Sequence, residues 1–399
     1  MAAAGAGAGA GANRWQVPVD SRAPEEGTIT YLQEESELKK AKGFFSFSYY
    51  SHNKLLGQQG RDKGASEGAS IYIWGMYLYT KLLEEPAFCG WKILIYTDQY
   101  TYEKLSAVPA DSRDYSQIQE LKRNLNVIFA IINWDRHSRV EKKINGGVLR
   151  TFRARAPFDF PDKSIFIRDA DTFFEKMVGR LKQPPQYFGG INEFLAYLKM
   201  VIKEIKEWEV GYLTTIQEIQ TRLGKPLLIV GTGSNLIVGF KGSSTNKTLY
   251  KQKYHDNEVT GIELPFGIFA GLVSVLPGVP IYQDMNVWNE CVDYLNTRSV
   301  KGNLITKANN TYHQFSDNDR IESIGRDEQM YLYILMRLSK DNLFIYDIDL
   351  GDLTVPTPES IDIRFHEFNL ARYKKALGLS GGRRKTYRRK RPHRQTRKH

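Results

Sequence analysis

The stretch SIFIRDAD, residues 164–171, joins an apolar run to two carboxylates that stand two positions apart. A short apolar run that ends in charged residues is typical of a buried strand that reaches the edge of a sheet. If the strand ends between Asp169 and Asp171, both side chains point into the cleft at the carboxyl edge of that sheet. We therefore interpret these residues as the end of a central strand and as the first candidate site.

Three similar strand patterns precede this stretch, at residues 44–50 (FFSFSYY), 91–97 (WKILIYT) and 126–132 (NVIFAII). Helical patterns occupy the intervals between them, at residues 70–84, 114–123 and 147–156. Strands that alternate with helices imply an α/β fold with a parallel sheet of the doubly wound kind, in which ligands bind at the carboxyl ends of the strands.

Beyond Asp171 the pattern changes. A long amphipathic helix is expected within residues 190–223, and we interpret it as a helical insertion. Further expected elements are a strand at 226–231, an apolar segment at 262–283, a buried helix at 326–338 and a late strand at 344–348.

The two ends of the chain differ in composition from the body. Residues 1–28 begin with MAAAGAGAGAGA, a Gly-rich and Ala-rich stretch that we expect to be disordered. Residues 43–375 are expected to form one domain that contains the insertion, followed by a basic disordered tail at 380–399. At 399 residues and 41% hydrophobic content, the chain has enough apolar material for a large core, which excludes wholesale disorder.

The net charge of +11 belongs to the tail and not to the body. Residues 381–399 hold ten Lys or Arg and no acid, so the rest of the chain has 46 basic and 45 acidic residues, a net charge of +1. A basic body shaped for nucleic acid is therefore excluded. The tail itself is a polycation that can bind polyanions such as nucleic acid, anionic lipid or a phosphorylated glycan, or act as a nuclear address.

Several other classes are also excluded. No apolar run approaches the roughly 18–20 residues of a membrane span, so we expect no transmembrane segment. Two cysteines supply neither a disulfide framework nor a multi-Cys zinc site. The first residues lack the basic region and the apolar core of a secretory signal. We expect a cytoplasmic protein.

Paired carboxylates at a sheet edge suit Mg²⁺ or Mn²⁺ that also holds a diphosphate. The alternative is a strand-end turn that solvates two acids. Two other pairs have the same spacing: Asp317/Asp319 in a polar loop, and Asp347/Asp349 after a strand, which is a real competitor. An aspartyl-nucleophile phosphatase is a further alternative, but its pattern requires Thr or Val at the position of Phe173.

The combination of Arg150-Thr151-Phe152-Arg153-Ala154 with Arg168-Asp169-Ala170-Asp171 resembles the GT-A glycosyltransferase superfamily. The resemblance covers residues 43–175 and 322–350. It implies a Rossmann-type mixed sheet flanked by helices, and an enzyme of the hexosyltransferase type. Such an enzyme moves a sugar from a nucleoside-diphosphate sugar to an acceptor, here unknown, with Asp169 and Asp171 holding Mn²⁺ or Mg²⁺ on the donor diphosphate.

The same resemblance implies roles for other residues, each with a plainer alternative. Arg150 and Arg153 would bind the donor phosphates or orient the Asp pair, or else form a solvated helix face or a salt bridge. Tyr50 and Asp98 would line the nucleotide cleft, or else be strand-end caps. Asp327 and Glu328 would be catalytic acids, or else acids that are favoured at a helix N-terminus by its dipole. His366 or His313 would supply a third metal ligand, or else be an ordinary histidine.

The basic tail also resembles tails common on proteins of large DNA viruses, which would place the chain in a host cytoplasm or a virion. This leads to an alternative of a different class: a non-catalytic, nucleic-acid-binding or virion structural protein with a polycationic tail. The two hypotheses differ at Asp169 and Asp171, because a structural protein needs no metal site there.

Overall fold

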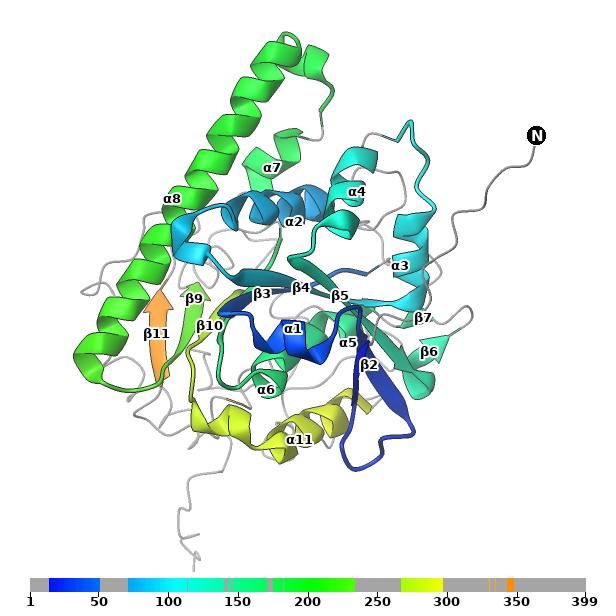
Figure 1. The fold of residues 1–399 in the computed structure, drawn as a ribbon, viewed down its shortest axis with the longest axis vertical. Coiled ribbons are helices and arrows are strands. Elements are labelled where there is room, and N and C mark those ends of the chain that lie inside the picture. Colours follow the sequence, from blue (N-terminus) through cyan, green and yellow to red (C-terminus); the bar gives the residue numbers. More distant parts are fainter. Residues whose placement is uncertain are drawn as a thin grey trace, which may run out of the picture.

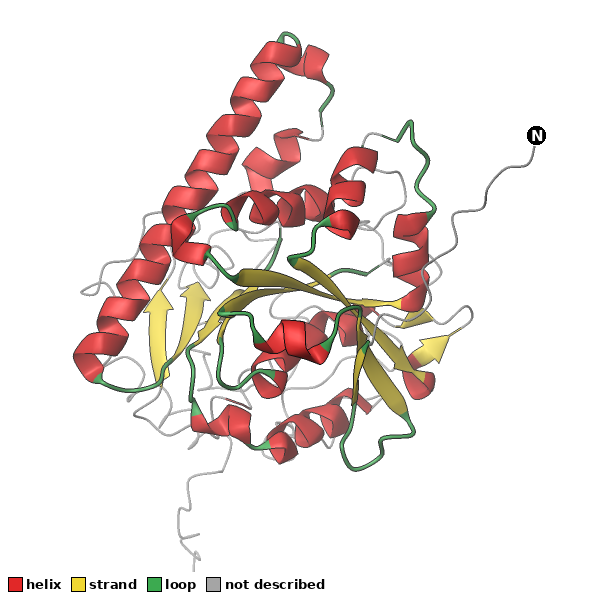
Figure 2. Ribbon diagram, viewed as in Figure 1, coloured by secondary structure: helices red, strands yellow, loops and turns green. Residues whose placement is uncertain are grey.

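The computed structural model describes residues 14–50, 71–112, 114–139, 143–144, 146–170, 175–181, 183–233, 267–296, 330, 334 and 343–347. Within this part of the chain, one sheet of nine strands lies between two layers of helices (Figures 1 and 2). The expected α/β class is confirmed.

The four strands expected from the sequence form the centre of the sheet. They are β3 (Gly43–Ser48), β4 (Trp91–Asp98), β5 (Val127–Trp134) and β8 (Ser164–Arg168). They pair in parallel in the order β5-β4-β3-β8, so the parallel pairing is confirmed. The chain first builds outward from β3 to β5 and then returns to add β8 on the other side of β3. The topological switch point of the sheet, where ligands bind in open α/β folds, therefore lies between β3 and β8.

Antiparallel strands complete the sheet on both sides. Beyond β8, β10 (Gly267–Val275) runs antiparallel to both β8 and β9 (Leu228–Gly233), and β11 (Leu343–Asp347) is parallel to β9. On the other side, β2 (Gly27–Tyr31) is antiparallel to β5, and β1 (Trp15–Pro18) is antiparallel to β2. A separate hairpin joins β6 (Ser138–Arg139) and β7 (Lys143–Ile144). The sheet is therefore mixed.

The two N-terminal strands correct the expectation of disorder up to residue 28 and of a domain that begins at residue 43. Residues 14–28 belong to the fold, because their side chains complete the core. The Trp15 ring stacks on Tyr31 at 4.9 Å between centroids, and Val19 and Ile29 are fully buried. The Gly-rich and Ala-rich composition is confined to residues 1–12, so it gives no reason to expect disorder in residues 14–28.

Strand alternation places two sets of apolar side chains on the two faces of the sheet. Phe45 and Phe47 of β3 belong to the cluster under one helix layer, whereas Phe44 belongs to the cluster under the other. The first layer comprises α2 (Ile71–Leu82), α3 (Gln99–Ser106), α4 (Tyr115–Arg123), α7 (Glu175–Leu181) and α8 (Ile191–Leu223). The second comprises α1 (Glu35–Lys39), α5 (Gly146–Thr151), α6 (Ala156–Asp159) and α11 (Met285–Asn296).

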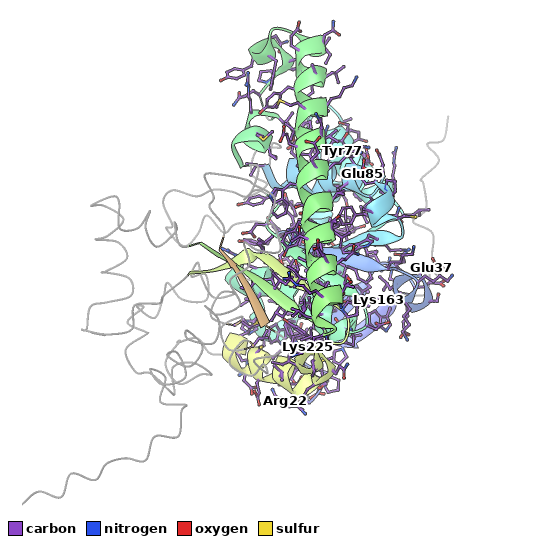
Figure 3. All side chains as sticks on the ribbon, turned by 90° about the vertical axis from the view of Figure 1, so that its left-hand side faces the viewer. Arg22, Glu37, Tyr77, Glu85, Lys163 and Lys225 are labelled. Carbon is purple, nitrogen blue, oxygen red and sulfur yellow. The ribbon has the colours of Figure 1, made fainter. Side chains whose placement is uncertain are left out.

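The long helix expected at 190–223 is confirmed as α8, a helix of 33 residues that spans about 50 Å. In Figure 3 it runs from the top of the molecule down to the level of Lys225, past the edge of the sheet. Its second half is part of the core, because Trp208, Tyr212 and Ile216 are buried. Lys206 also forms a salt bridge of 2.8 Å with Glu85, beyond the end of α2. The helix ends at Gly224, whose φ of 61° is readily adopted only by glycine.

Of the buried helix expected at 326–338, the structure describes Met330 and Ile334, both helical and buried. The late strand expected at 344–348 corresponds to β11. No helix in the described ranges has both the length and the apolar character that crossing a membrane requires.

Candidate functional site

Asp169 is the first residue after β8, at the carboxyl edge of the sheet and beside the switch point between β3 and β8. Its backbone N–H donates a hydrogen bond of 3.3 Å to the carbonyl of Gly271 in β10. Its side chain is 21% exposed. The structure thus places Asp169 where the doubly wound topology predicts a ligand.

Two arginines face the carboxylate of Asp169. Arg153 lies in a short 3-10 helix (Phe152–Arg155) and is buried. Its Nη1 contacts Asp169 Oδ1 and also donates to the carbonyl of Arg168 at 3.2 Å. Arg150 of α5 is 24% exposed, and its Nη2 lies 4.0 Å from Asp169 Oδ2. Both arginines therefore form salt bridges with Asp169, which is the plainer of the alternatives given for them above. The bond from Arg153 also orients the Asp169 carboxylate.

Two serines of β3 hold the segment that carries these arginines. Ser46 and Ser48 lie on the same face of the strand. Their hydroxyls donate to the carbonyls of Arg153 at 2.8 Å and of Arg150 at 3.2 Å. Small polar side chains at these positions allow the helical segment to approach β3 closely. The sequence signal was the alternation in FSFS, where one face of the strand is aromatic and the other hydroxylic.

Two glycines permit the close packing around the 169–170 loop. A Cβ on Gly271 would lie 2.7 Å from Asp169 Oδ2 and 2.9 Å from its Cβ, so the Asp169 side chain rests on the bare backbone of β10. A Cβ on Gly75 of α2 would lie 1.8 Å from the carbonyl oxygen of Ala170. The loop is therefore enclosed by β10 on one side and α2 on the other. Sequence reasoning missed both glycines.

Tyr50 and Asp98, the other strand-end candidates, differ in their surroundings. Tyr50 is half-buried, and its ring packs on Gly146 at the start of α5, where a Cβ would lie 2.7 Å from two ring atoms. The structure thus brings Tyr50 to the helix that carries Arg150.

Asp98 is fully buried at the end of β4. Its Oδ1 accepts from the backbone N–H of Thr101 and its Oδ2 from that of Ile144, both at 2.7 Å. These contacts correspond to the strand-end cap, the alternative interpretation. They make Asp98 the group that begins α3 and fixes β7.

A buried ion pair lies on the other face of the β8 end. The Arg168 guanidinium binds Glu209 of α8 through both carboxylate oxygens, at 2.8 and 3.0 Å, and both side chains are 0% exposed. The Tyr79 hydroxyl of α2 donates to the same Glu209 at 2.6 Å. Burial alone would lower the pKa of Arg168, but the Glu209 carboxylate raises it above its ordinary value.

The guanidinium of Arg168 also lies over three aromatic rings, those of Phe166, Trp208 and Tyr212. Sequence reasoning missed Glu209. The available signal was its place in the apolar stripe of α8, where Ile205, Glu209 and Tyr212 share one face.

The other predicted site residues lie outside the described residues: Asp171, Asp327, Glu328, His366 and His313. The same holds for Asp317, Asp319 and Asp349, whereas Asp347 is the last residue of β11. In the part of the chain that the structure describes, no three His, Cys, Asp or Glu side chains cluster as metal ligands would. Of the predicted site residues, the structure brings together Asp169, Arg150 and Arg153, and it places the Tyr50 ring against Gly146 at the start of the helix that carries Arg150.

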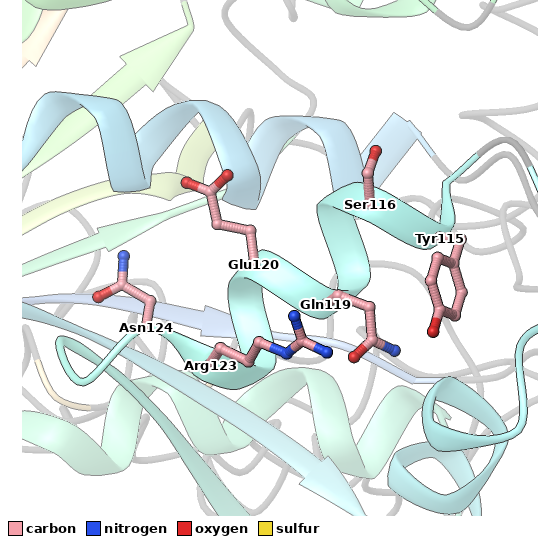
Figure 4. A pocket seen from close by; sticks show the side chains of 6 residues that line it. All are labelled: Tyr115, Ser116, Gln119, Glu120, Arg123 and Asn124. Atoms are coloured by element: carbon pink, nitrogen blue, oxygen red, sulfur yellow. The ribbon is translucent and has the colours of Figure 1, made fainter. Parts of the chain in front are cut away.

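A hollow of about 550 Å³ lies on the outer surface beside α4 (Figure 4). Its lining side chains all come from α4 or the residue that follows it: Tyr115, Ser116, Gln119, Glu120, Arg123 and Asn124. None of them is a predicted site residue, and no charged side chain among them is buried. We assign no chemistry to this hollow.

No protein-family model, curated protein or solved structure matches the chain.

Proposed function

We propose that the protein is a glycosyltransferase of GT-A type, which moves a sugar from a nucleoside-diphosphate sugar to an acceptor. The observation that carries this proposal is the place of Asp169, at the carboxyl end of β8 beside the switch point, with Arg150 and Arg153 against it. The mixed sheet flanked by helices also agrees with the sheet that the sequence resemblance implies.

The chemistry of these side chains suits a metal-bound diphosphate. In the proposal, Asp169 and Asp171 hold Mn²⁺ or Mg²⁺, because both cations prefer carboxylate oxygens. The cation makes the nucleoside diphosphate a better leaving group. Arg150, the more exposed of the two arginines, is placed to contribute positive charge to the same phosphates.

The remaining roles are proposed from the sequence resemblance. His366 would supply a third metal ligand. Asp327 or Glu328 would bind acceptor hydroxyls, or act as general base if the enzyme inverts the configuration of the sugar. Tyr50 would line the nucleotide cleft from just beyond the end of β3. The resemblance implies the same role for Asp98, but this residue is fully buried and would act only by holding the backbone of α3 and β7 in place.

Donor binding is tested by thermal unfolding of the full chain with a panel of nucleoside-diphosphate sugars, with and without Mn²⁺. A ligand that binds only the folded state stabilises it by mass action, by about 2.7 kcal/mol at one hundred times its dissociation constant. We expect at least one donor to raise the melting temperature only when Mn²⁺ is present. A panel without any metal-dependent shift would exclude the proposal.

The Asp171→Asn variant tests the metal site directly. Asparagine keeps the shape and removes one charge, so donor binding with Mn²⁺ should be lost while the apo protein stays as stable as the wild type. Asp162→Asn is the matched control, because Asp162 is 73% exposed and precedes the other end of β8. If Asp171→Asn is destabilised without metal and still binds donor with Mn²⁺, Asp171 is a structural residue and Asp347/Asp349 becomes the next candidate.

The concentration of charge in the tail favours a second candidate, a non-catalytic protein that binds polyanions. Deletion of residues 381–399 removes ten basic residues and lowers the net charge from +11 to +1. We expect the truncated chain to keep donor binding and to lose salt-sensitive binding to DNA or heparin. A wild-type chain that binds polyanions but no donor would favour the second candidate.

A further inference from the structure

Alternate residues of β3 contact the segment that carries the two arginines of the candidate site. The Ser46 hydroxyl donates to the carbonyl of Arg153, and the Ser48 hydroxyl donates to the carbonyl of Arg150. As these contacts advance by two residues along β3, they move back by three residues along the other segment. The segment from α5 to the 3-10 helix that follows it therefore runs antiparallel to β3.

A third contact continues the series. Tyr50 lies two positions beyond Ser48, and its ring packs on Gly146, four positions before Arg150. Two residues of a strand span about 6.6 Å, and three or four residues of a helix span about 5–6 Å. Because the two repeats nearly match, the contacts stay in step at all three positions. The strand thereby fixes where the backbone of Arg150 lies.

The two arginines held in this way differ in what their side chains can reach. The Arg153 side chain is 2% exposed, and its Nη1 contacts Asp169 and the carbonyl of Arg168. The Arg150 side chain is 24% exposed, and its Nη2 lies 4.0 Å from Asp169 Oδ2, which is beyond the range of a hydrogen bond. Of this pair, Arg150 is therefore the one that a phosphate group from solvent can contact.

We propose that Ser48 is a positioning residue for Arg150, and that Arg150 binds a phosphate group of the donor without requiring a metal ion. The Ser48 hydroxyl holds the Arg150 backbone against β3, so that the guanidinium lies beside Asp169 at the carboxyl end of β8. A guanidinium binds phosphate oxygens through two parallel N–H groups, which requires a fixed orientation. The inference rests on the proposed function, which places the donor phosphates at this end of the sheet.

The test is the affinity of the full chain for inorganic pyrophosphate in excess EDTA. Titration calorimetry measures it at a temperature where circular dichroism shows every variant to be folded. The polycationic tail is expected to bind anions as well, so Arg150→Gln in the full chain gives the background, and the binding that it loses is the binding at Arg150. We expect Ser48→Ala to weaken this binding by about 3–10-fold, the effect of one lost hydrogen bond. Ser48→Thr keeps the hydroxyl and should restore the affinity of the wild type.

Ser46→Ala is the matched control, because it makes the same change two positions away on the same face of β3. Ser46 is fully buried and its hydrogen bond is the shorter one, so Ser46→Ala should lower the melting temperature more than Ser48→Ala does. Its partner Arg153 is buried, so the affinity for pyrophosphate should stay close to that of the wild type. A general loss of stability would instead rank the two variants in the same order in both measurements.

The inference is overturned if Arg150→Gln or Ser48→Ala binds pyrophosphate like the wild type, or if Ser46→Ala weakens binding as much as Ser48→Ala. Each of these results leaves the proposed function standing as long as a donor raises the melting temperature with Mn²⁺. A wild type that shows no such shift with any donor overturns the proposed function, whatever it binds in EDTA.

Discussion

Arg153 and Asp169 are 16 residues apart in the chain, and their side chains form a salt bridge at the end of β8. The same Nη1 of Arg153 donates to the carbonyl of Arg168. One buried guanidinium therefore fixes both the last peptide of the strand and the first side chain beyond it. The orientation of the Asp169 carboxylate is therefore set by contacts within the protein itself.

Arg153→Lys should destabilise the protein by about 1–3 kcal/mol, because a buried ammonium cannot reproduce the contacts of a planar guanidinium and leaves a polar group unsatisfied. Arg150→Lys is the matched control and should cost less than about 1 kcal/mol, since Arg150 is 24% exposed and 4.0 Å from Asp169. Urea unfolding measures both. Equal losses would contradict the central role given to Arg153.

The same glycine-to-alanine change should have opposite effects on stability in two helices. We expect Gly75→Ala in α2 to destabilise the protein and Gly179→Ala in α7 to stabilise it. A Cβ on Gly75 would lie 1.8 Å from the Ala170 carbonyl oxygen, so α2 or the loop must shift, at a cost of about 1–3 kcal/mol or more. A Cβ on Gly179 meets its nearest neighbour at an ordinary 3.6 Å, so helix propensity should dominate and stabilise by up to about 1 kcal/mol. Thermal unfolding of the two variants gives the comparison. A stabilised Gly75→Ala would show that α2 does not press on the loop.

Asp159→Asn should cost about 3–5 kcal/mol, because it leaves a buried arginine without its counter-charge. Asp159 lies 2.8 Å from Arg155 and accepts from the Tyr31 hydroxyl at 2.6 Å, and the two ionic side chains are each 2% exposed. Glu35→Gln removes the exposed pair with Lys39 and should cost less than about 1 kcal/mol. Chemical denaturation separates the two. A small loss of stability in Asp159→Asn would contradict the burial of Arg155, because it would mean that solvent reaches its guanidinium.

Alkaline pH should unfold the protein cooperatively. Burial raises the pKa of five tyrosines above the ordinary value of about 10: Tyr31, Tyr79, Tyr96, Tyr212 and Tyr282. Above that pH the unfolded chain releases these protons and the folded chain keeps them, so stability falls as the pH rises. Phenolate absorbance of the buried set should therefore appear together with the loss of secondary structure. Gradual ionisation of this set in a folded protein would refute the burial.

The central sheet could be predicted because its signals are local. Each of the four parallel strands is a short apolar run, and each is separated from the next by a helical pattern. The N-terminal strands could not be predicted in the same way, because β1 and β2 are stabilised by distant partners. Trp15 and Val17 are partly buried because they pack against the core, and the Trp15 ring lies 5.5 Å from that of Phe160, 145 positions later in the chain. Sequence pattern alone cannot supply such contacts.

The candidate site was predicted in part. The position of Asp169 follows from the end of an apolar strand, and Arg150 and Arg153 from a resemblance, but neither argument gives the geometry between them. The glycines at 75 and 271 could not be recognised, because a glycine required by a neighbour 95 or 102 positions away looks the same in the sequence as one in a flexible loop. Glu209 was recognisable in principle, since a charged residue in an apolar stripe needs a buried partner.

The position of β10 affects the order in which the chain can fold during its synthesis. β8 pairs with β3 on one side, but its other neighbour, β10, ends at residue 275, more than 100 residues later. At roughly 5–20 residues per second, a ribosome takes several seconds to supply that strand. Throughout this interval the edge of Ser164–Arg168, three of whose five side chains are Ile or Phe, is open to pairing with another nascent chain. Arg168 carries the one charge among these five residues, and it opposes such aggregation until β10 has been synthesised. In the folded protein the same side chain forms the buried ion pair with Glu209.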